Sequence, residues 1–570
     1  MRNIYTKYFT SSMHHYAAFA KSLSWVNKMR LYPRVYLLIL SILSGGLFGL
    51  AWCSTWFGWL LGIAVIPLLL IVKHTTTTSE KRSFLYCFFY ILLTLLLWNC
   101  LTIWWISNAA FAAFFFTACY NAVFLSIPWF VYYYIRKWAG VYMAYIGLAA
   151  CWLTLEHAHL SWEFWELTFP WLNLGNGLAA MAPWIQWYEY TGILGGSLWI
   201  LGINMMLYHL LFEQHTSFLR NTFYCWLLLP LSISLIIYYS YNDQGIGVEV
   251  VTVQPNFDSY TEKSITSPLF VPYVNQIDRL LTLSKKELTP ATCLVVWPES
   301  AIDCCLEERY VHDYVCIQPI LQFLEKHDAL SLITGASSFR SYGVTKATQT
   351  ARKRGTQYVD YYNSVFYFKS GRKVVIYHKE KRLPGAEYIP YFHSFPEKAL
   401  KWIKRKMAEI GDIDPCLGKG NGSKVFQVNQ QIKVAPINCY ESIYGAFVGS
   451  AAQKGANLFA VLTNDCWWGN TPVYYHHFQY SRLLAIAHRK SVIRAANTGI
   501  CGFINQRGDV IAATKQLESV AMRQIVQANN QITFYSLHGD YIGYIASYSL
   551  LILIFIALAI RLYQKQNFCF

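Results

Sequence analysis

Eight apolar stretches constrain this chain more than any other feature of its sequence. A segment needs about 20 mostly apolar residues to cross the hydrocarbon core of a bilayer as a helix. Only 14% of the 570 residues are charged, whereas a soluble globular protein has about 25%. We therefore predict eight transmembrane helices, at residues 35–52, 56–72, 84–105, 109–135, 141–155, 191–211, 224–240 and 541–562.

The residues between the seventh and eighth stretches are much more polar and numerous enough to bury a core of their own. The sequence thus predicts four parts in chain order. They are a basic N-terminal extension (1–34), seven transmembrane helices (35–240), one large domain (241–538), and an eighth helix with a short tail (539–570).

The basic residues beside the apolar stretches predict the orientation, because lysine and arginine near span ends are retained in the cytoplasm. The N-terminal segment is basic, as is every second loop after it, for example at Arg136 and Arg220. The alternate loops, 53–55, 106–108 and 156–190, contain neither lysine nor arginine. Both termini are therefore expected in the cytoplasm and the large domain outside it. Because much of the net charge of +16 serves this purpose, nucleic-acid binding is not expected.

The large domain alternates short β-branched runs with helical or loop segments, which is typical of α/β folds. In open α/β sheets, ligands and chemistry gather beyond the carboxyl ends of the strands. The residues that follow each run are therefore the ones to inspect. The predicted strands are "GVEVVTV", "TCLVVW", "LSLITGA", "SVFYFK", "KVVIYH", "IKVAPI" and "NLFAVL".

Three of these runs are followed by Glu299, Lys379 and Cys439. Each has an ordinary structural interpretation. An unpaired cysteine is usually a small buried apolar residue, Glu299 could be a solvated turn residue, and Lys379 could belong to a solvated run of charges. Together they suggest nucleophilic catalysis, because a thiol with a pKa near 8.5 needs a base to become a thiolate. Glu299 is the candidate base. Lys379 and the backbone amide of Tyr440 are candidate stabilisers of an oxyanion.

Four segments carry a family resemblance: "WPES" (297–300), "YHKEKRLPGAEYIP" (377–390), "NCYES" (438–442) and "TNDCWWG" (463–469). This ordered set resembles the nitrilase superfamily of Glu-Lys-Cys amidases. With its apolar stretches, the chain resembles the apolipoprotein N-acyltransferase family from about residue 35 to 562. The resemblance implies an extracytoplasmic α-β-β-α sandwich attached to a helical membrane bundle.

The same resemblance implies a role for individual residues. Glu299 corresponds to the general base, Lys379 to the oxyanion stabiliser and Cys439 to the acylated nucleophile. The sequence departs from the family where Gly385 and Ala386 replace a Phe-Gly pair. The residues expected to support the triad or position substrate are Glu387, Tyr440, Glu441 and Trp467.

The implied reaction has two steps. Cys439 takes an acyl chain from a membrane phospholipid as a thioester and passes it to the N-terminal α-amino group of the S-diacylglyceryl-cysteine of an apolipoprotein. The expected partners are therefore the phospholipid, the apolipoprotein and the bilayer. Neither a metal nor an organic cofactor is expected, and we expect a monomer. The expected location is a bacterial inner membrane, with the catalytic domain in the periplasm.

Two other functions compete with acyl transfer. A membrane-tethered amidase or nitrilase would use the same triad on a small carbon–nitrogen substrate. A transporter or receptor with an idle outer domain is disfavoured, because ionisable residues mark transport pathways and the apolar stretches contain almost none. Their asparagines, Asn99, Asn121 and Asn204, are expected to form interhelical hydrogen bonds.

Three further segments suggest contact with lipid. Residues 340–360 and 399–406 are basic, and the second also has apolar residues at helical spacing. We expect both to touch lipid headgroups as interfacial segments do, with an ordinary solvated surface as the alternative. The aromatic segment 166–176 is expected to border a lipid entry, or else to belong to the aromatic belt of the membrane interface.

Overall fold

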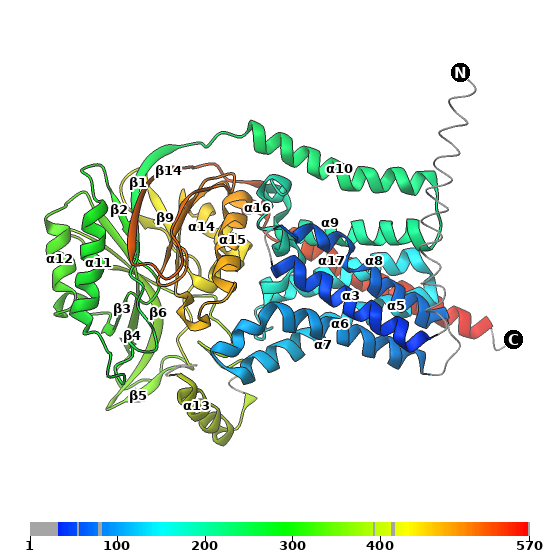
Figure 1. Cartoon of the computed structure of the whole chain (residues 1–570). Helices are drawn as coiled ribbons and strands as arrows, with labels where there is room; N and C mark the ends of the chain where they lie inside the picture. Colours follow the sequence, from blue (N-terminus) through cyan, green and yellow to red (C-terminus); the bar gives the residue numbers. More distant parts are fainter. Residues whose placement is uncertain (1–31, 54–55, 78–81, 392–393, 412–415, 568–570) are drawn as a thin grey trace.

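The structure is a computed structural model that describes residues 32–53, 56–77, 82–391, 394–411 and 416–567. The predicted N-terminal extension, residues 1–34, therefore lies almost entirely outside the described residues. Figure 1 shows two parts, a bundle of long helices and an α/β domain at one end of it. The C-terminal helix returns to the bundle and ends far from the domain.

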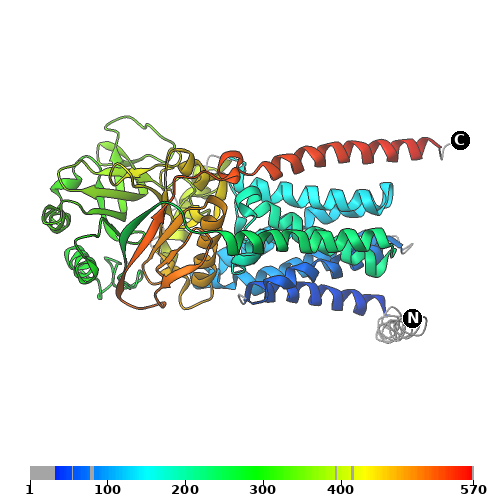
Figure 2. The ribbon, with the colours of Figure 1, turned by 90° about the horizontal axis from the view of Figure 1, so that it is seen from above.

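All eight apolar stretches form helices, and these lie side by side in Figures 1 and 2. The second stretch is broken into two helices after a short 3₁₀ turn, η1 (Gly58–Leu60). The helices are α3 (Pro33–Cys53), α4 (Leu61–Ala64), α5 (Ile66–Thr77), α6 (Ser83–Ile103), α7 (Phe111–Ala139), α8 (Val141–Ser161), α9 (Tyr188–Phe212), α10 (Ser217–Ser240) and α17 (Tyr541–Asn567).

Within the described residues, seven helical segments are long and apolar enough to cross a membrane. The segment of the predicted eight that falls short is α8, which packs against α7 and α17. Its last turns contain Glu156, His157 and His159, and these lower its mean hydropathy. The number of transmembrane helices therefore stays a prediction.

The intramembrane asparagines bond between helices, as the sequence predicts. Asn121 Nδ2 on α7 donates to Asn99 Oδ1 on α6 at 2.8 Å. Asn204 on α9 donates through Nδ2 to the carbonyl of Leu61 at 2.7 Å and accepts from the backbone N–H of Val65 at 2.9 Å. These polar groups are thus satisfied inside the bundle, where water is absent.

The domain contains two sheets that face each other, and all seven predicted runs lie in its strands. The first sheet has the order β14-β1-β2-β4-β6-β5, with β3 beside β4 and β7 beside β6. Its strands are β1 (Ile246–Gln254), β2 (Leu294–Val296), β3 (Ile302–Glu307), β4 (Ser331–Ser341), β5 (Arg352–Arg354), β6 (Gln357–Lys369), β7 (Val375–His378) and β14 (Val520–Ala528).

The second sheet has the order β13-β12-β11-β10-β9-β8, and its three central strands are parallel. Fully apolar parallel strands are buried on both faces, and β10 and β11 are buried along their whole length. The strands are β8 (Phe426–Gln427), β9 (Lys433–Asn438), β10 (Leu458–Thr463), β11 (Ser491–Ala496), β12 (Gly502–Ile504) and β13 (Val510–Ala513).

Helices cover the outer face of each sheet and complete the predicted α-β-β-α sandwich. The pair α11 (Tyr273–Glu287) and α12 (Gln318–Glu325) covers the first sheet, on the side away from the bundle. The pair α14 (Gly445–Gln453) and α15 (Val473–His488) covers the second sheet and lies toward the bundle. The short α16 (Phe534–His538) joins β14 to α17.

The sandwich and the bundle share one apolar core. Tyr440, Ile443 and Tyr444, which follow β9, pack in the same cluster as Trp171 and Ile193 of the bundle part. The chain enters the sandwich from α10 and leaves it through α16, so the domain is held at both ends. The loops at this junction therefore lie between the domain and the bundle.

The two basic segments expected to touch lipid adopt different structures. Residues 340–360 form the end of β4, a loop, and the hairpin of β5 and β6. Residues 399–406 lie in α13 (Glu397–Gly411), at the edge of the domain in Figure 1. The side chain of Trp402 on this helix is 57% exposed. Their contact with lipid stays a prediction.

Candidate active site

The three predicted catalytic residues each follow a strand. Glu299 comes just after β2, Lys379 directly after β7 and Cys439 directly after β9. Strands β2, β4 and β7 run in the same direction, because β7 and β4 are both antiparallel to β6. The carboxyl ends of these strands therefore meet at one edge of the first sheet, and hydrogen bonds described below join this edge to the end of β9.

Lys379 lies between two carboxylates. Its Nζ is 3.2 Å from Glu299 Oε1 and 2.9 Å from Glu387 Oε1, and both Lys379 and Glu299 are buried. Burial alone would lower the pKa of Lys379, but the charges of Glu299 and Glu387 hold this pKa well above its usual range. The two carboxylates therefore favour the ammonium form of Lys379.

Asn363, in the middle of β6, organises this cluster. Its Nδ2 donates to Glu299 Oε1 and to Glu387 Oε1, each at 2.8 Å. Its Oδ1 accepts from Asn438 Nδ2 at 2.8 Å, next to Cys439 in the chain. Its role was not predicted from the sequence. Its sequence signal is an asparagine within a strand pattern, where that residue is disfavoured.

Cys439 begins the 3₁₀ helix η8 (Cys439–Ile443) in a left-handed backbone conformation, with φ of +52°. Such conformations are costly for a residue with a Cβ and gather at functional sites. Thr463 Oγ1 donates to its Sγ at 3.4 Å. Burial and the carboxylate of Glu299 raise the pKa of the Cys439 thiol, while Lys379 opposes them. The resting form is therefore the thiol, and a base is needed to activate it.

Glu299 is fixed from the second sheet as well. Its Oε2 accepts from the backbone N–H of Asn464 at 2.9 Å, and Asn464 follows Thr463, the residue that contacts the sulfur. The carboxylate is thereby held toward the end of β10, beside the thiol. Glu299, Lys379, Glu387 and Cys439 thus belong to one connected cluster.

Glu441 positions the backbone around this cluster. Its Oε1 accepts from Tyr377 Oη at 2.5 Å and from the backbone N–H groups of Glu380 and Lys381 at 2.7 and 3.2 Å. Its Oε2 accepts from the backbone N–H of Asn438 at 2.8 Å. Burial raises the pKa of Glu441 to about 7, although these hydrogen bonds oppose the shift. Glu441 therefore joins the segments that follow β7 and β9.

Tyr440 points toward the bundle. Its Oη donates to the carbonyl of Thr168 at 3.1 Å, and Tyr444 Oη donates to Thr168 Oγ1 at 3.0 Å. The aromatic segment 166–176 therefore contacts the residue next to Cys439. Trp467 lies elsewhere: its ring packs edge-on against Tyr260, with 5.3 Å between centroids, outside the hydrogen-bonded cluster.

A buried ionic network that the sequence analysis did not identify lies behind the thiol. Asp465 pairs with His477 Nδ1 at 3.0 Å and with Arg494 Nη2 at 3.2 Å. Burial alone would raise the pKa of Asp465, but these two partners hold it below its usual range. Asp465 Oδ1 also lies 3.1 Å from Thr463 Oγ1, so it competes with Cys439 Sγ for the single hydroxyl proton, and His477 Nε2 lies 3.3 Å from the carbonyl of Cys439. The network thus supports both sides of the nucleophile.

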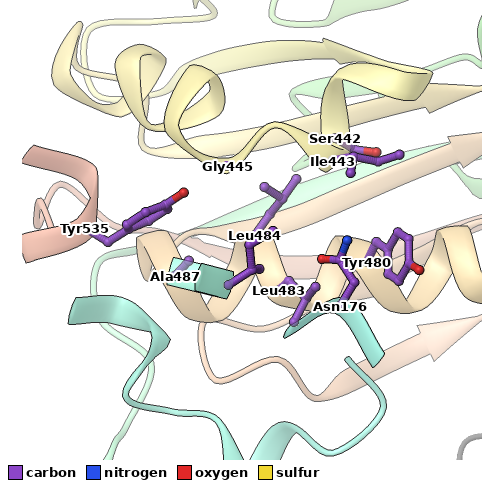
Figure 3. A pocket seen from close by; sticks show the side chains of 10 residues that line it. Asn176, Ser442, Ile443, Gly445, Tyr480, Leu483, Leu484, Ala487 and Tyr535 are labelled. Carbon is purple, nitrogen blue, oxygen red and sulfur yellow. The ribbon is translucent and has the colours of Figure 1, made fainter. Parts of the chain in front are cut away.

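A small apolar cavity lies between η8 and α15 (Figure 3). Ser442, Gly445, Leu484 and Tyr535 line it. Its volume of about 20 Å³ holds roughly one water molecule, so it does not accommodate an acyl chain. Among the residues that the structure describes, no group of three or more His, Cys, Asp or Glu side chains could hold a metal ion.

Comparison with known proteins identifies both parts of the chain. Residues 265–531 match the family model described as carbon-nitrogen hydrolase. A sandwich of this kind, carried on a bundle of apolar helices, defines a membrane-bound member of the nitrilase superfamily. Residues 44–206 match the model of the apolipoprotein N-acyltransferase N-terminal domain.

Several curated relatives match across both parts. The chain is 26% identical to the apolipoprotein N-acyltransferase of Chlorobaculum tepidum, over 79% of this chain and 84% of that protein. It is 25% identical to the enzyme of Geobacter metallireducens, over 69% of this chain and 70% of that protein. The chain is 28% identical to the apolipoprotein N-acyltransferase of Aquifex aeolicus, over 60% of this chain and 67% of that protein. The chain belongs to the apolipoprotein N-acyltransferase family.

Proposed function

We propose that this membrane protein transfers an acyl chain from a phospholipid to the N-terminal amine of diacylglyceryl-modified apolipoproteins, through a thioester on Cys439. The observation that carries the proposal is the contact between the two parts. Tyr440, beside the thiol, bonds to Thr168 of the bundle part at 3.1 Å. The nucleophile is thus next to the helices that meet the lipid.

In the first step, Glu299 accepts the proton of the Cys439 thiol as the sulfur attacks the ester carbonyl of the phospholipid. Lys379 and the backbone N–H of Tyr440 stabilise the resulting oxyanion; amides at the start of a helix have no partner within it. The carbon–oxygen bond then breaks. The leaving alkoxide takes the proton from Glu299, and a lysophospholipid departs.

In the second step, the amine of the apolipoprotein attacks the thioester. Glu299 accepts a proton from the amine and returns it to the departing thiolate, so that the Cys439 thiol is regenerated and an amide is formed. A covalent intermediate divides one difficult transfer into two easier ones. Neither step requires a metal or an organic cofactor. Asn363, Glu387 and Glu441 hold the reacting groups in position.

The attachment of the α/β domain to the helical bundle has an energetic reason. Moving an acyl chain of about 16 carbons from the bilayer into water costs on the order of 13 kcal/mol, at ~0.8 kcal/mol for each methylene. Both substrates must therefore be met at the membrane surface. We propose an orientation that serves this: the domain on the periplasmic face of a bacterial inner membrane and both termini in the cytoplasm.

The first test is the acyl-enzyme itself. Purified full-length protein incubated with a phospholipid should gain one acyl mass on Cys439, and the adduct should disappear when a diacylglyceryl peptide is added. Cys439→Ala should abolish it, while Cys293→Ala, which alters a cysteine just before β2, should not. A protein that releases ammonia from small amides and never acquires the acyl mass would be an amidase instead.

A further inference from the structure

A polar cavity of about 150 Å³ lies beside the cluster, between the loop after α8 and the segment after β7. Trp162 and Trp165 line it from the bundle side, and Lys381, Arg382 and Tyr388 from the domain. On this measure of volume, about 10–15 Å³ is enough for one water molecule. The cavity therefore has room for a phosphate group and several waters.

Lysine and arginine side chains line this cavity at three positions, and glutamates line it at Glu163, Glu166 and Glu380. Within the described residues, two of the three cations, Lys381 and Arg382, form no ion pair with a carboxylate. Among the described residues, the Lys381 ammonium has neither an ion pair nor a hydrogen bond; it lies over the rings of Tyr444 and Phe447, at 5.4 and 5.9 Å. Arg382 Nη1 donates to the carbonyl of Leu417 at 2.6 Å, and the guanidinium lies over the Tyr388 ring at 4.7 Å. A guanidinium has five donors, so most of them remain for a ligand.

Other lysines nearby are paired, which makes Lys381 stand out. Lys379 contacts two carboxylates, and Lys419, which also lines the cavity, lies 3.0 Å from Glu380. Burial and the neighbouring Lys419 lower the pKa of Lys381. Lys381 and Arg382 are half-buried beside one cavity, and among the described residues neither makes a direct ion pair, so an anion that contacts both would be stabilised there.

The cavity is close to the nucleophile. Tyr444, under the Lys381 ammonium, packs edge-on against Tyr440 with 5.5 Å between ring centroids. The backbone of Lys381 donates to Glu441, two residues after Cys439. Tryptophans such as those of the rim are enriched at the headgroup level of membranes. An anion bound here would therefore lie beside residues that contact Tyr440 and Glu441, the two residues that follow Cys439.

We propose that this cavity binds the phosphodiester of the phospholipid acyl donor, with Lys381 and Arg382 as its ligands. The inference rests on the proposed function, because it names the headgroup site of that reaction. The exposed Glu163 on the rim lies where the ammonium of a zwitterionic headgroup would be attracted. The ester bonds of the same lipid then extend toward Cys439.

A binding experiment tests the cavity apart from catalysis. Full-length Cys439→Ala protein in detergent is offered phosphatidylethanolamine, diacylglycerol or inorganic phosphate, and retained ligand is measured by native mass spectrometry. We expect phosphatidylethanolamine to be retained about tenfold better than diacylglycerol, since hydrogen bonds to charged groups are the strong ones. Adding Lys381→Met should abolish this preference, Lys381→Arg should keep it, and Lys515→Met, at an exposed position, should not change it.

Three results of this experiment would overturn the inference. The first is an equal retention of the two lipids, and the second is a preference that survives Lys381→Met. The third is binding of inorganic phosphate that depends on Lys381 without any preference between the lipids, which would make the cavity a site for free phosphate. If the preference holds and Lys381 controls it, but wild-type protein never forms a thioester, the headgroup site stands and the proposed function fails.

A kinetic experiment separates the headgroup from the reacting groups. Lys381→Met should raise the phospholipid concentration for half-maximal acylation of Cys439 at least about tenfold. Acylation by a p-nitrophenyl ester, which has no phosphate, should stay at the wild-type rate. An equal loss with both donors would mean that Lys381 only supports the active site, and the inference would be wrong.

Discussion

At the scale of single residues, the hydrogen bonds of Glu441 predict the effect of removing its charge. Three backbone N–H groups and the hydroxyl of Tyr377 all donate to this carboxylate. In Glu441→Gln, an amide NH₂ must face at least one of these donors. We expect a loss of about 1–3 kcal/mol of stability and much slower acylation of Cys439.

The thermal unfolding midpoint and the rate of thioester formation measure these two effects. Glu518→Gln, which alters an exposed carboxylate near Lys515, is the matched control and should change neither. If Glu441→Gln behaved like this control, Glu441 would not hold the segments after β7 and β9 in place.

The charges around Cys439 predict that Glu299→Gln abolishes acyl transfer but makes Cys439 easier to alkylate. The Glu299 carboxylate raises the pKa of the thiol, whereas Lys379 lowers it. In Glu299→Gln the negative charge is removed and the ammonium stays, so the pKa of Cys439 should fall. Acyl transfer should be lost, yet alkylation of Cys439 by iodoacetamide should shift to lower pH, because the thiolate is the reactive form.

Mass spectrometry of the alkylated Cys439 peptide across a pH series gives this profile. The comparison is with wild type and with Lys379→Met, in which the shift should run toward higher pH. A Glu299→Gln profile that moved upward would mean that Glu299 does not act on the sulfur through its charge.

At the scale of elements, the approach of β4 to the end of β2 sets the position of Glu299. A Cβ at Gly335 would lie 2.5 Å from the Cα of Glu299 and 2.5 Å from the backbone nitrogen of Ser300. Both are backbone atoms, so the strands must separate. Gly335→Ala should therefore displace Glu299, lower stability by about 1–3 kcal/mol and abolish acylation.

Gly247→Ala, in β1 of the same sheet, is the control for Gly335→Ala in β4. Its Cβ would meet only side-chain atoms, the nearest being Ile525 Cγ2 at 3.3 Å. We expect a small change in unfolding temperature and normal thioester formation. Near wild-type acylation by Gly335→Ala protein would show that the site tolerates movement between β2 and β4.

At the scale of the whole molecule, the helices predict on which side of the membrane the domain lies. Alkaline phosphatase is active only where its disulfides form, outside the cytoplasm. A fusion after Asp243, between α10 and β1, should be active, and a fusion after Gln214, between α9 and α10, should be inactive. The reverse pattern would place the domain in the cytoplasm, away from the proposed substrates.

Much of this architecture follows from the sequence alone. The apolar stretches predicted the helices, and the β-branched runs predicted seven strands, because burial demands apolar residues at a fixed period. The order of Glu299, Lys379 and Cys439 after strands also predicted which residues to inspect, since strand ends meet at a sheet edge.

The tertiary structure alone decided which polar groups meet. Asn363 bonds to Glu299 across 64 residues of sequence, Asp465 pairs with Arg494 in a buried network, and Lys381 lines a cavity without an ion pair among the described residues. Apolar periodicity reports that a side chain is buried, whereas a hydrogen bond depends on the position of two atoms from distant segments. That position is fixed only when the sheets pack against each other and against the bundle.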